Sequence, residues 1–318
     1  MTVPVRIACD AFDTMRALQD GSIGVEGAVL HFETEMTNPE RHRRMVRDLA
    51  FDICELNVST YLIARERGVP ITAIPIFPFR KFRHGSIFVR GDSGLTSAGE
   101  LAGRRIGVPN MQPASNVWIR GILRDAGKLD DRDVTWVTEK DEEIDFLHAL
   151  AARTERAPQG KRLDDLLVEG AIDAIISPLV PASVIAGDGR IRRLYPDYVA
   201  RERAYFQRSG QFPIMHLMAV SDRFAREHPQ LLGSLADAFE RSKQAAFAQM
   251  RNVRLVSLAW FGAHWEDEQA LFGPDAWPNG LIPINRQAIE MAQRYTFEQG
   301  LIGSLKAVDE LFWDGGPG

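Results

Sequence analysis

The order of strand-like and helix-like segments is the feature that most restricts how this chain folds. Strand patterns at Val5–Cys9, Val29–Glu33 and Phe51–Val58 alternate with helical patterns at Pro39–Leu49 and Tyr61–Arg67, with short connections. This alternation is typical of βαβ units, in which parallel strands form a sheet that helices cover. The sequence therefore predicts an α/β fold. Because ligands of such sheets bind at the carboxyl ends of the strands, polar residues at strand ends are the first site candidates.

A second series of the same kind begins after residue 92. Arg105–Val108 and Val134–Thr138 are strand-like, and Asn116–Ala126 between them is helical. The chain of 318 residues is also longer than a typical single-core domain. Two domains are therefore predicted, with a boundary near residues 92 and 93.

The balance of charges excludes partners that need a strongly basic surface. The chain has 38 basic and 43 acidic residues and a formal net charge of −5, so nucleic acid and anionic membrane are not expected partners. No run approaches the roughly 18 apolar residues that indicate a membrane-spanning helix. Because no signal peptide is recognisable, a cytoplasmic location is expected unless a leader has been removed.

The cysteines and histidines give no indication of a metal site. Cys9 and Cys54 lie in strand-like runs, where buried reduced thiols are expected, and neither belongs to a Cys-x-x-Cys spacing. The seven histidines are dispersed, without a His-x-His or His-x₃-His pair. No metal or other cofactor is therefore expected, although residues distant in sequence can still converge in a fold.

A basic segment, residues 79–84, lies between the apolar run Ile71–Phe77 and the strand-like run Ile87–Val89. Its arginines offer planar sets of donors to carboxylates, and His84 exchanges a proton near neutral pH. Two interleaved phenylalanines favour a position that faces a ligand. A solvated basic loop is the alternative, and the local sequence leaves both interpretations open.

Two carboxylates accompany strand ends. Asp10 follows the first strand, and Glu55, with Ser59 shortly after it, lies in the third, where an unpaired carboxylate would be costly. The arginines of the helix Pro39–Leu49 are interpreted mostly as a solvated face. The acidic stretch 139–145 is interpreted in the same way.

Seven segments, spread in order over nearly the whole chain, resemble the 4,5-dihydroxyphthalate decarboxylases. They are residues 51–56 (FDICEL), 82–86 (FRHGS), 114–121 (ASNVWIRG), 170–174 (GAIDA), 212–216 (FPIMH), 272–280 (FGPDAWPNG) and 298–301 (EQGL). The chain departs from the family pattern at Ala114-Ser115, where a threonine-alanine pair is expected, and at Gly85, where serine is common. Because one hydroxyl changes which ring substituents a pocket can pair, the exact substrate stays open.

The resemblance implies a two-lobed, type 2 periplasmic-binding-protein-like fold. Each lobe would be a mainly parallel sheet flanked by helices, with the ligand cleft between the lobes. Lobe 1 would comprise residues 1–92 and 217–318, and lobe 2 residues 93–216. The resemblance also implies an aromatic carboxylate as ligand and a carboxy-lyase of aromatic catabolism, as in phthalate degradation. It leaves a homo-oligomer open.

Loss of a carboxylate directly from an aromatic ring leaves an anion in the ring plane, which the π-system does not stabilise. An enzyme without a cofactor must therefore protonate the ring carbon first, and a hydroxyl para to that carbon makes this feasible. A base takes the phenolic proton while an acid protonates the carbon that bears the carboxylate, and carbon dioxide leaves as aromaticity returns. The site needs one acid, one base and cations that hold carboxylates.

Three residues are candidates for the proton transfers. His84 is the predicted proton donor, Glu55 is the predicted base, and His216 lies at the second lobe crossover, where it could face His84. The structural alternative for His84 is a hydrogen bond to a backbone carbonyl. For Glu55 it is an ion pair that holds an arginine of the basic segment, and for His216 it is a buried core histidine. Asp10 is a substrate-binding candidate whose alternative is helix capping.

Arg83 and Arg120 are the predicted carboxylate clamps, one from each lobe. Trp118 is predicted to stack on the substrate ring. The alternatives are an ordinary solvent-exposed helix arginine for Arg120 and simple packing for Trp118. The remaining predicted substrate-binding residues are one cation and several hydrogen-bond donors: Arg80, Ser59, Ser115, Asn116 and Ser177.

Three classes of function remain. The preferred one is cofactor-independent decarboxylation of a hydroxylated aromatic dicarboxylate, of the type that converts 4,5-dihydroxyphthalate to protocatechuate. A solute-binding protein that captures an aromatic or other small carboxylate for an ABC transporter or a sensor would share the fold and the arginines. A related lyase or hydrolase on the same scaffold is the third, since a fold does not fix the chemistry.

Overall fold

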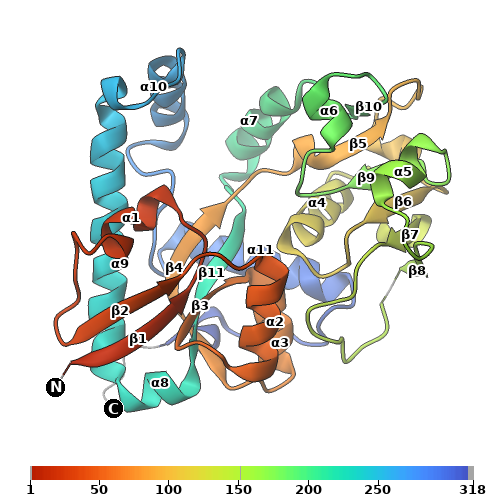
Figure 1. Cartoon of the computed structure of the whole chain (residues 1–318). Helices are drawn as coiled ribbons and strands as arrows, with labels where there is room; N and C mark the ends of the chain where they lie inside the picture. Colours follow the sequence, from red (N-terminus) through yellow and green to blue (C-terminus); the bar gives the residue numbers. More distant parts are fainter. Residues whose placement is uncertain (1, 151, 314–318) are drawn as a thin grey trace. The chain divides into compact units, whose positions relative to one another are not determined.

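The computed structural model describes residues 2–150 and 152–313, and the chain divides into two compact units (Figure 1). The units are unit 1, with Met1–Arg80, Ile214–Ile289 and Lys306–Gly318, and unit 2, with Lys81–Pro213 and Glu290–Leu305. The extreme ends of the predicted lobe 1, Met1 and residues 314–318, lie outside the described residues.

The limits of the predicted lobes need correction in three places. The return to unit 1 lies between Pro213 and Ile214, so residues 214–216, including His216, belong to unit 1 and not to the predicted lobe 2. Strand β5 (Ile87–Arg90) pairs antiparallel with β9 (Ala174–Ile176) and β10 (Ile191–Arg193), so it belongs to unit 2. The first crossover therefore follows Arg80 and not residue 92. Residues 290–305 also belong to unit 2, where Tyr295 packs edge-on against Trp118.

The sheet of unit 1 has five strands in the order β2-β1-β3-β11-β4. They are β1 Val3–Ala8, β2 Ala28–Glu33, β3 Ile53–Asn57, β4 Ile71–Arg80 and β11 Ile214–Ser221. β1 pairs parallel with β2 and β3, and β11 runs antiparallel to β3 and β4. The sheet is mixed because the chain re-enters unit 1 at Ile214, opposite Arg80 at the end of β4, and runs back along that strand.

The helices of unit 1 are α1 Arg16–Gln19, α2 Asn38–Asp48, α3 Val58–Glu66, α8 Asp222–Glu227, α9 Pro229–Arg251 and α10 Phe261–Phe272, with the short 3₁₀ helices η1 Asp13–Met15, η5 Val253–Leu255 and η6 Val308–Leu311. The division between the units falls within α11 (Pro283–Glu298). α9 is the longest of these helices and packs along α1 and β4 (Figure 1).

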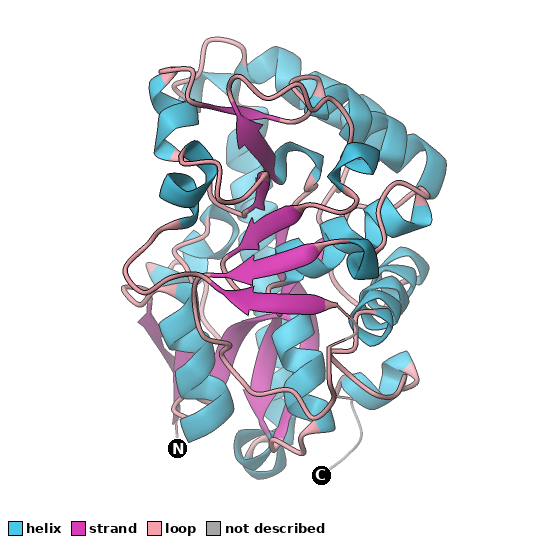
Figure 2. Cartoon of the chain, turned by 90° about the vertical axis from the view of Figure 1, so that its right-hand side faces the viewer, coloured by secondary structure: helices cyan, strands magenta, loops and turns pink. Residues whose placement is uncertain are grey.

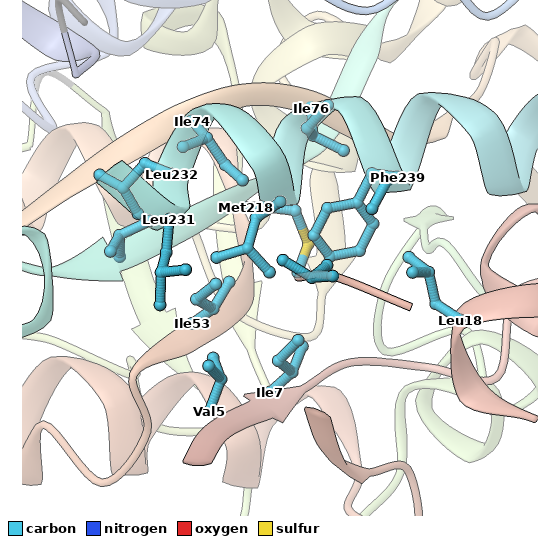
Figure 3. Close-up of a cluster of buried hydrophobic side chains, with 14 of the residues drawn as sticks. Val5, Ile7, Leu18, Ile53, Ile74, Ile76, Met218, Leu231, Leu232 and Phe239 are labelled. Carbon is cyan, nitrogen blue, oxygen red and sulfur yellow. The ribbon is translucent and has the colours of Figure 1, made fainter. Parts of the chain in front are cut away.

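The core of unit 1 lies between α9 and the sheet (Figure 3). Apolar residues recur at helical spacing in residues 229–249 of the sequence, which predicts an apolar face on this helix. That face of α9, including Leu232 and Phe239, is buried against Val5 and Ile53 from the sheet and Met218 from β11. Each fully buried side chain of this kind contributes about 1.5–3 kcal/mol relative to an exposed one. The helical period in the sequence therefore predicts this face correctly.

The sheet of unit 2 has six strands in the order β10-β5-β9-β6-β7-β8, and its strands run through the middle of Figure 2. The strands not yet given are β6 Arg105–Val108, β7 Thr135–Thr138 and β8 Arg153–Arg156. The helices are α4 Ala114–Asp125, α5 Leu163–Val168, α6 Ala182–Ala186 and α7 Tyr198–Ser209, with the 3₁₀ helices η2 His84–Ser86, η3 Ala98–Leu101 and η4 Asp131–Asp133. β6, β7 and β8 are parallel, so the predicted second βα series is confirmed.

Two further sequence expectations have clear outcomes. The sequence of residues 154–161 is polar and turn-rich, but the stretch begins within the exposed edge strand β8, which pairs with β7. Cys9 and Cys54 are buried and are not joined in a disulfide bond, as expected. Within residues 2–150 and 152–313, no helix is both long and apolar enough to cross a membrane.

Gly121 on α4 provides a test of packing in unit 2. A β-carbon at this position would lie 2.2 Å from Cγ of the Tyr295 ring. We expect Gly121→Ala to lower the free energy of unfolding by about 1–3 kcal/mol, because the ring is buried and has little room to move. The measurement is urea unfolding, followed by circular dichroism.

The matched control is Gly233→Ala on α9, where nothing lies within 4 Å of an added β-carbon. That change should leave stability unchanged or raise it by up to about 1 kcal/mol, because alanine favours the helix over glycine. Equal effects of the two changes would contradict the tight packing of Gly121 on Tyr295.

Candidate active site

A cluster of charged side chains, buried except for Asp10, lies at the carboxyl ends of β1 and β3 in unit 1. Glu55, in β3, is fully buried and accepts hydrogen bonds from the Asp10 amide (2.8 Å), from Arg41 Nη2 (2.7 Å) and from His216 Nδ1. Arg41 Nη1 also donates to Asp10 Oδ1 (2.9 Å). We call Asp10, Arg41, Glu55 and His216 the Glu55 cluster. Three of the predicted site residues therefore come together.

The donors around Glu55 keep its carboxylate ionised. Burial alone would raise the pKa of Glu55, but His216, Arg41 and the Asp10 amide outweigh burial and lower this pKa to about 2. A carboxylate with such a low pKa accepts a proton poorly at neutral pH. The geometry therefore favours an orienting role for Glu55 over the predicted role of base.

His216 is the proton-exchanging group of the cluster. An ionised carboxylate only accepts hydrogen bonds, so His216 Nδ1 carries the proton that it shares with Glu55. Burial lowers the pKa of His216, and Glu55 opposes that shift. The imidazole is therefore neutral near pH 7, with its Nε2 lone pair as the basic position. The Phe79 ring, 5.1 Å away between centroids, packs edge-on against it.

Arg41 is the residue of this cluster that the sequence interpretation missed. Its side chain is fully buried, whereas Arg43 and Arg47 on the same helix are exposed. The interpretation of the α2 arginines as a solvated face is therefore wrong for Arg41. The signal was its spacing: Arg41 and Met45 are four residues apart on one helix face, and both are buried.

The Glu55 cluster should make the protein less stable in acid. The pKa of Glu55 is about 2 when folded against an ordinary 4.5, so its contribution is complete above pH 4.5 and is lost as the pH falls towards 2. From this group we expect a loss of about 2 kcal/mol between about pH 5 and about pH 3. Urea unfolding of the wild type and of Glu55→Gln at both pH values measures it, and an equal loss in both proteins would contradict it.

Arg80 and Arg83, neighbours in the basic segment, lie in different units. Arg80 ends β4 in unit 1, where Nη2 donates to the Pro278 carbonyl (2.8 Å) and to Asn285 Oδ1 (2.6 Å). Its guanidinium is thus held by protein groups. Arg83 lies in unit 2 and is 5% exposed, and its burial lowers its pKa to about 10, against the opposing charge of Glu202. The basic segment is therefore not a solvated loop. The prediction that Arg83 and Arg120 come from different lobes is wrong, because both belong to unit 2.

His84 is buried in unit 2 beside the Tyr205 ring, at 5.4 Å between centroids. Its burial, together with Arg201 and Arg208, lowers the pKa of His84 to about 4. The imidazole is therefore neutral near pH 7, and it becomes a proton donor only if an anion raises this pKa. The predicted role of His84 as acid thus depends on a bound carboxylate.

The glycine after His84 is explained by a neighbouring ring. A β-carbon on Gly85 would lie 2.7 Å from Cδ2 of Tyr198, so this ring leaves no space for a serine side chain. Arg193 donates to the Gly85 carbonyl and lies over the same ring, 4.7 Å from its centroid. The ring of Tyr198 therefore explains the departure from the family pattern, because it fills the space that a serine side chain at residue 85 would need.

The predicted residues of α4 are buried and held by their own unit. Arg120 donates to the Gln299 side chain and pairs with Asp131 at 3.4 Å, so it is not the solvent-exposed arginine of the alternative interpretation. Trp118 is fully buried against Tyr295, which favours packing over ring stacking with a substrate. Asn116 Nδ2 donates to the Asn110 carbonyl (2.8 Å).

The serines are dispersed. Ser59 is fully buried in the first turn of α3, and Ser115 is buried in the first turn of α4. The hydroxyl of Ser177 accepts a hydrogen bond from the Leu179 amide (3.1 Å), so it stabilises the turn after β9. Substrate binding by these serines stays a prediction.

Two glutamates in the acidic stretch 139–145 are not solvated, contrary to the expectation. Glu142 accepts hydrogen bonds from the Met111 and Gln112 amides (2.7 and 3.2 Å), and burial raises its pKa to about 7. Glu143 is buried and accepts from Gln112 Nε2 (3.1 Å). The solvated interpretation of residues 139–145 is therefore wrong for both glutamates. Among the residues with a described placement, no group of three or more His, Cys, Asp or Glu is arranged to hold a metal ion.

Unit 1 also contains a cavity of about 200 Å³, whose lining includes the aromatic side chains of Phe12, Phe261 and Trp265. The charged residues in its lining are Asp13 and Glu268. Two carboxylates without a lining cation make this cavity unsuitable for a dicarboxylate.

Comparison with known proteins identifies the family. The chain is 33% identical over 316 residues to a 4,5-dihydroxyphthalate decarboxylase of Comamonas testosteroni. The aligned region covers 96% of this chain and 95% of the relative. The chain is 37% identical over 199 residues to a 4,5-dihydroxyphthalate decarboxylase of Pseudomonas putida, covering 60% of this chain and 76% of the relative. No protein-family model matches the chain.

Solved structures share the fold at low sequence identity. The periplasmic aliphatic sulphonate binding protein SsuA of Escherichia coli matches with a TM-score of 0.60 and 12% identity, over 99% of this chain and 98% of that one. The alkanesulfonate-binding protein SsuA of Xanthomonas axonopodis pv. citri gives 0.55 and 17%, over 98% of each chain. The desulfurization enzyme DszB gives 0.52 and 18%, over 98% of this chain and 96% of that one.

The expected two-unit α/β fold class is confirmed, since both the binding proteins and an enzyme share this architecture. The expectation of a mainly parallel sheet is wrong for unit 1, where β11 runs antiparallel to both of its neighbours. Identity over almost the full length of a decarboxylase goes beyond fold. With its two α/β units and the type 2 periplasmic-binding-protein fold, the chain belongs to the 4,5-dihydroxyphthalate decarboxylase family of carboxy-lyases.

Proposed function

We propose that this protein decarboxylates a hydroxylated aromatic dicarboxylate, as in the conversion of 4,5-dihydroxyphthalate to protocatechuate. Membership of the decarboxylase family supports this activity. The observation that carries the proposed chemistry is the buried Glu55–His216 pair, in which an ionised carboxylate fixes a neutral imidazole. A cytoplasmic location and a role in aromatic catabolism are part of the same proposal.

In the proposed reaction, His216 Nε2 takes the proton of the ring hydroxyl that lies para to the carboxylate-bearing carbon. Electron density then moves to that carbon, which accepts a proton from the acid. The C–C bond to the carboxylate breaks and carbon dioxide leaves, while the electron pair of that bond returns to the ring and gives a phenolate. The phenolate takes its proton back from His216. Atoms and charge balance without a redox step. Glu55 stabilises the imidazolium that forms, because it already accepts the Nδ1 proton.

The ring carbon must receive its proton from an acid. His84 is the predicted donor, and Arg83 the predicted carboxylate clamp. Burial and arginines hold the pKa of His84 at about 4, so a bound dianion would have to raise it. A substrate carboxylate beside His84 would raise this pKa, because its negative charge favours the imidazolium form. His84→Ala should therefore abolish turnover and leave binding largely intact.

The direct test is to mix the protein, treated with a chelator, with 4,5-dihydroxyphthalate. Release of carbon dioxide and appearance of protocatechuate are followed by chromatography. Turnover supports the proposal. If the compound stays intact with both the chelator-treated protein and a metal-replete sample, the result contradicts the proposal.

The fold likeness to sulphonate-binding proteins favours one second candidate, a solute-binding protein for a small carboxylate. Isothermal titration calorimetry with the same compound distinguishes the two. Binding without turnover, in both chelated and metal-replete samples, would make the binding protein the better assignment.

A further inference from the structure

Tyr205 on α7 carries a buried hydroxyl that the proposed reaction does not use. The residue is 5% exposed, and its Oη has no hydrogen-bond partner among residues 2–150 and 152–313. The nearby Ser209 hydroxyl donates to the Tyr205 backbone carbonyl (2.7 Å). Native proteins pair almost all buried polar groups, and an unpaired one costs about 1–3 kcal/mol. We therefore expect this hydroxyl to form a hydrogen bond with a group outside the protein.

The neighbouring ring has the same property. His84 is 8% exposed, and its Nδ1 also lacks a hydrogen-bond partner among the described residues. The two rings are adjacent, 5.4 Å apart between centroids and tilted by 55°. Two unpaired buried polar atoms on neighbouring rings are unlike an isolated packing defect. They are the arrangement expected of a site that pairs with a ligand.

The surroundings specify the chemistry of that ligand. Arg201 and Arg208 act on His84 as positive charges, and the buried Arg83 precedes it in the chain. Burial raises the pKa of Tyr205 to about 12, so the hydroxyl is a donor near pH 7. The charges that act on this hydroxyl are mixed, since Asp125 is negative and Arg208 and Arg294 are positive. Beside the arginines that act on His84, a neutral donor suits an anionic oxygen, such as a carboxylate or a phenolate.

A cluster of aromatic rings adjoins this pair on the side of Tyr205. Phe82 lies edge-on to Tyr205 (6.3 Å between centroids) and to Phe206 (6.5 Å), and it stacks on Phe212 (4.7 Å). Such rings exclude water, which strengthens a hydrogen bond to an anion. They also provide apolar surface for a benzene ring.

We propose that Tyr205 is a substrate-binding residue, whose hydroxyl donates a hydrogen bond to an anionic oxygen of the aromatic acid beside His84. This inference rests on the proposed function, since it names a residue that recognises the same substrate class. It goes beyond the residues that the sequence predicts, because Tyr205 lies in none of the segments that resemble the family.

The test is Tyr205→Phe, which removes only the unpaired hydroxyl. KM for 4,5-dihydroxyphthalate should rise about tenfold or more, as for a lost hydrogen bond to a charged group. The urea midpoint should not fall, because no hydrogen bond within the protein is lost. A structural role alone would not raise KM.

The matched control is Tyr195→Phe in the same unit. The Tyr195 hydroxyl accepts a hydrogen bond from the Ala98 amide (2.9 Å), so its removal should lower the urea midpoint and leave KM unchanged. An unchanged KM in Tyr205→Phe would overturn the inference, and so would a loss of stability equal to that of the control. If the wild type neither binds nor converts the compound, the proposed function fails instead.

Discussion

Replacing His216 with glutamine should reduce kcat for 4,5-dihydroxyphthalate by at least about 10²–10⁴-fold, the usual contribution of a positioned proton-transfer group. Glutamine can keep a hydrogen bond to Glu55, but it cannot accept a proton near neutral pH. The affinity for the substrate should change little, because the lost function is proton transfer. Initial rates by chromatography and calorimetric titration measure the two quantities separately.

The control for this change is His31→Gln. His31 is exposed on β2, so the replacement should leave both kcat and KM at wild-type values. Glu55→Gln provides a further comparison, since it keeps the imidazole and removes the carboxylate that holds its Nδ1 proton. Its kcat should fall because the neutral amide stabilises the imidazolium less. A wild-type kcat in His216→Gln would exclude His216 from the reaction.

The elements that sequence predicts best are those whose signal is local. The apolar period of α9 and the continuous apolar run of β3 both follow from burial of one element against its neighbours. The unit boundaries are predicted less well. β5 is assigned to its unit by pairing with β9, which lies far along the chain, and α11 shows no break in its helical pattern where the division falls. Such contacts between distant parts of the chain cannot be recognised from a local sequence pattern.

The same distinction explains the candidate site. Glu55 is recognisable because an isolated carboxylate in an apolar strand needs a partner. The partner itself is not recognisable: the basic segment is the expected source, whereas the structure provides Arg41 from α2. Which arginine approaches depends on how α2 packs on β3, and four arginines on that helix offer equal charge. Burial separates them, and sequence alone does not give burial.

Arg41→Met should be the most destabilising single change in the Glu55 cluster, lowering the free energy of unfolding by about 3–5 kcal/mol at pH 7. Arg41 and Glu55 are both fully buried and lie 2.7 Å apart, so the change leaves a carboxylate in the core without its arginine. Arg43→Met on the same helix is the control, because Arg43 is exposed and should cost little. Urea unfolding by circular dichroism measures both, and equal losses would contradict the buried pair.

The double change Arg41→Met with Glu55→Gln then separates the stability of the cluster from its chemistry. Removal of both charges leaves no unpaired ion in the core, so much of the stability lost in Arg41→Met should return. Turnover should stay low, because His216 still lacks the carboxylate that holds its Nδ1 proton. A double variant as unstable as Arg41→Met would mean that Arg41 stabilises the fold through Asp10 and not through Glu55. A stable double variant with normal turnover would remove the carboxylate from the mechanism, because the imidazole would then work without it.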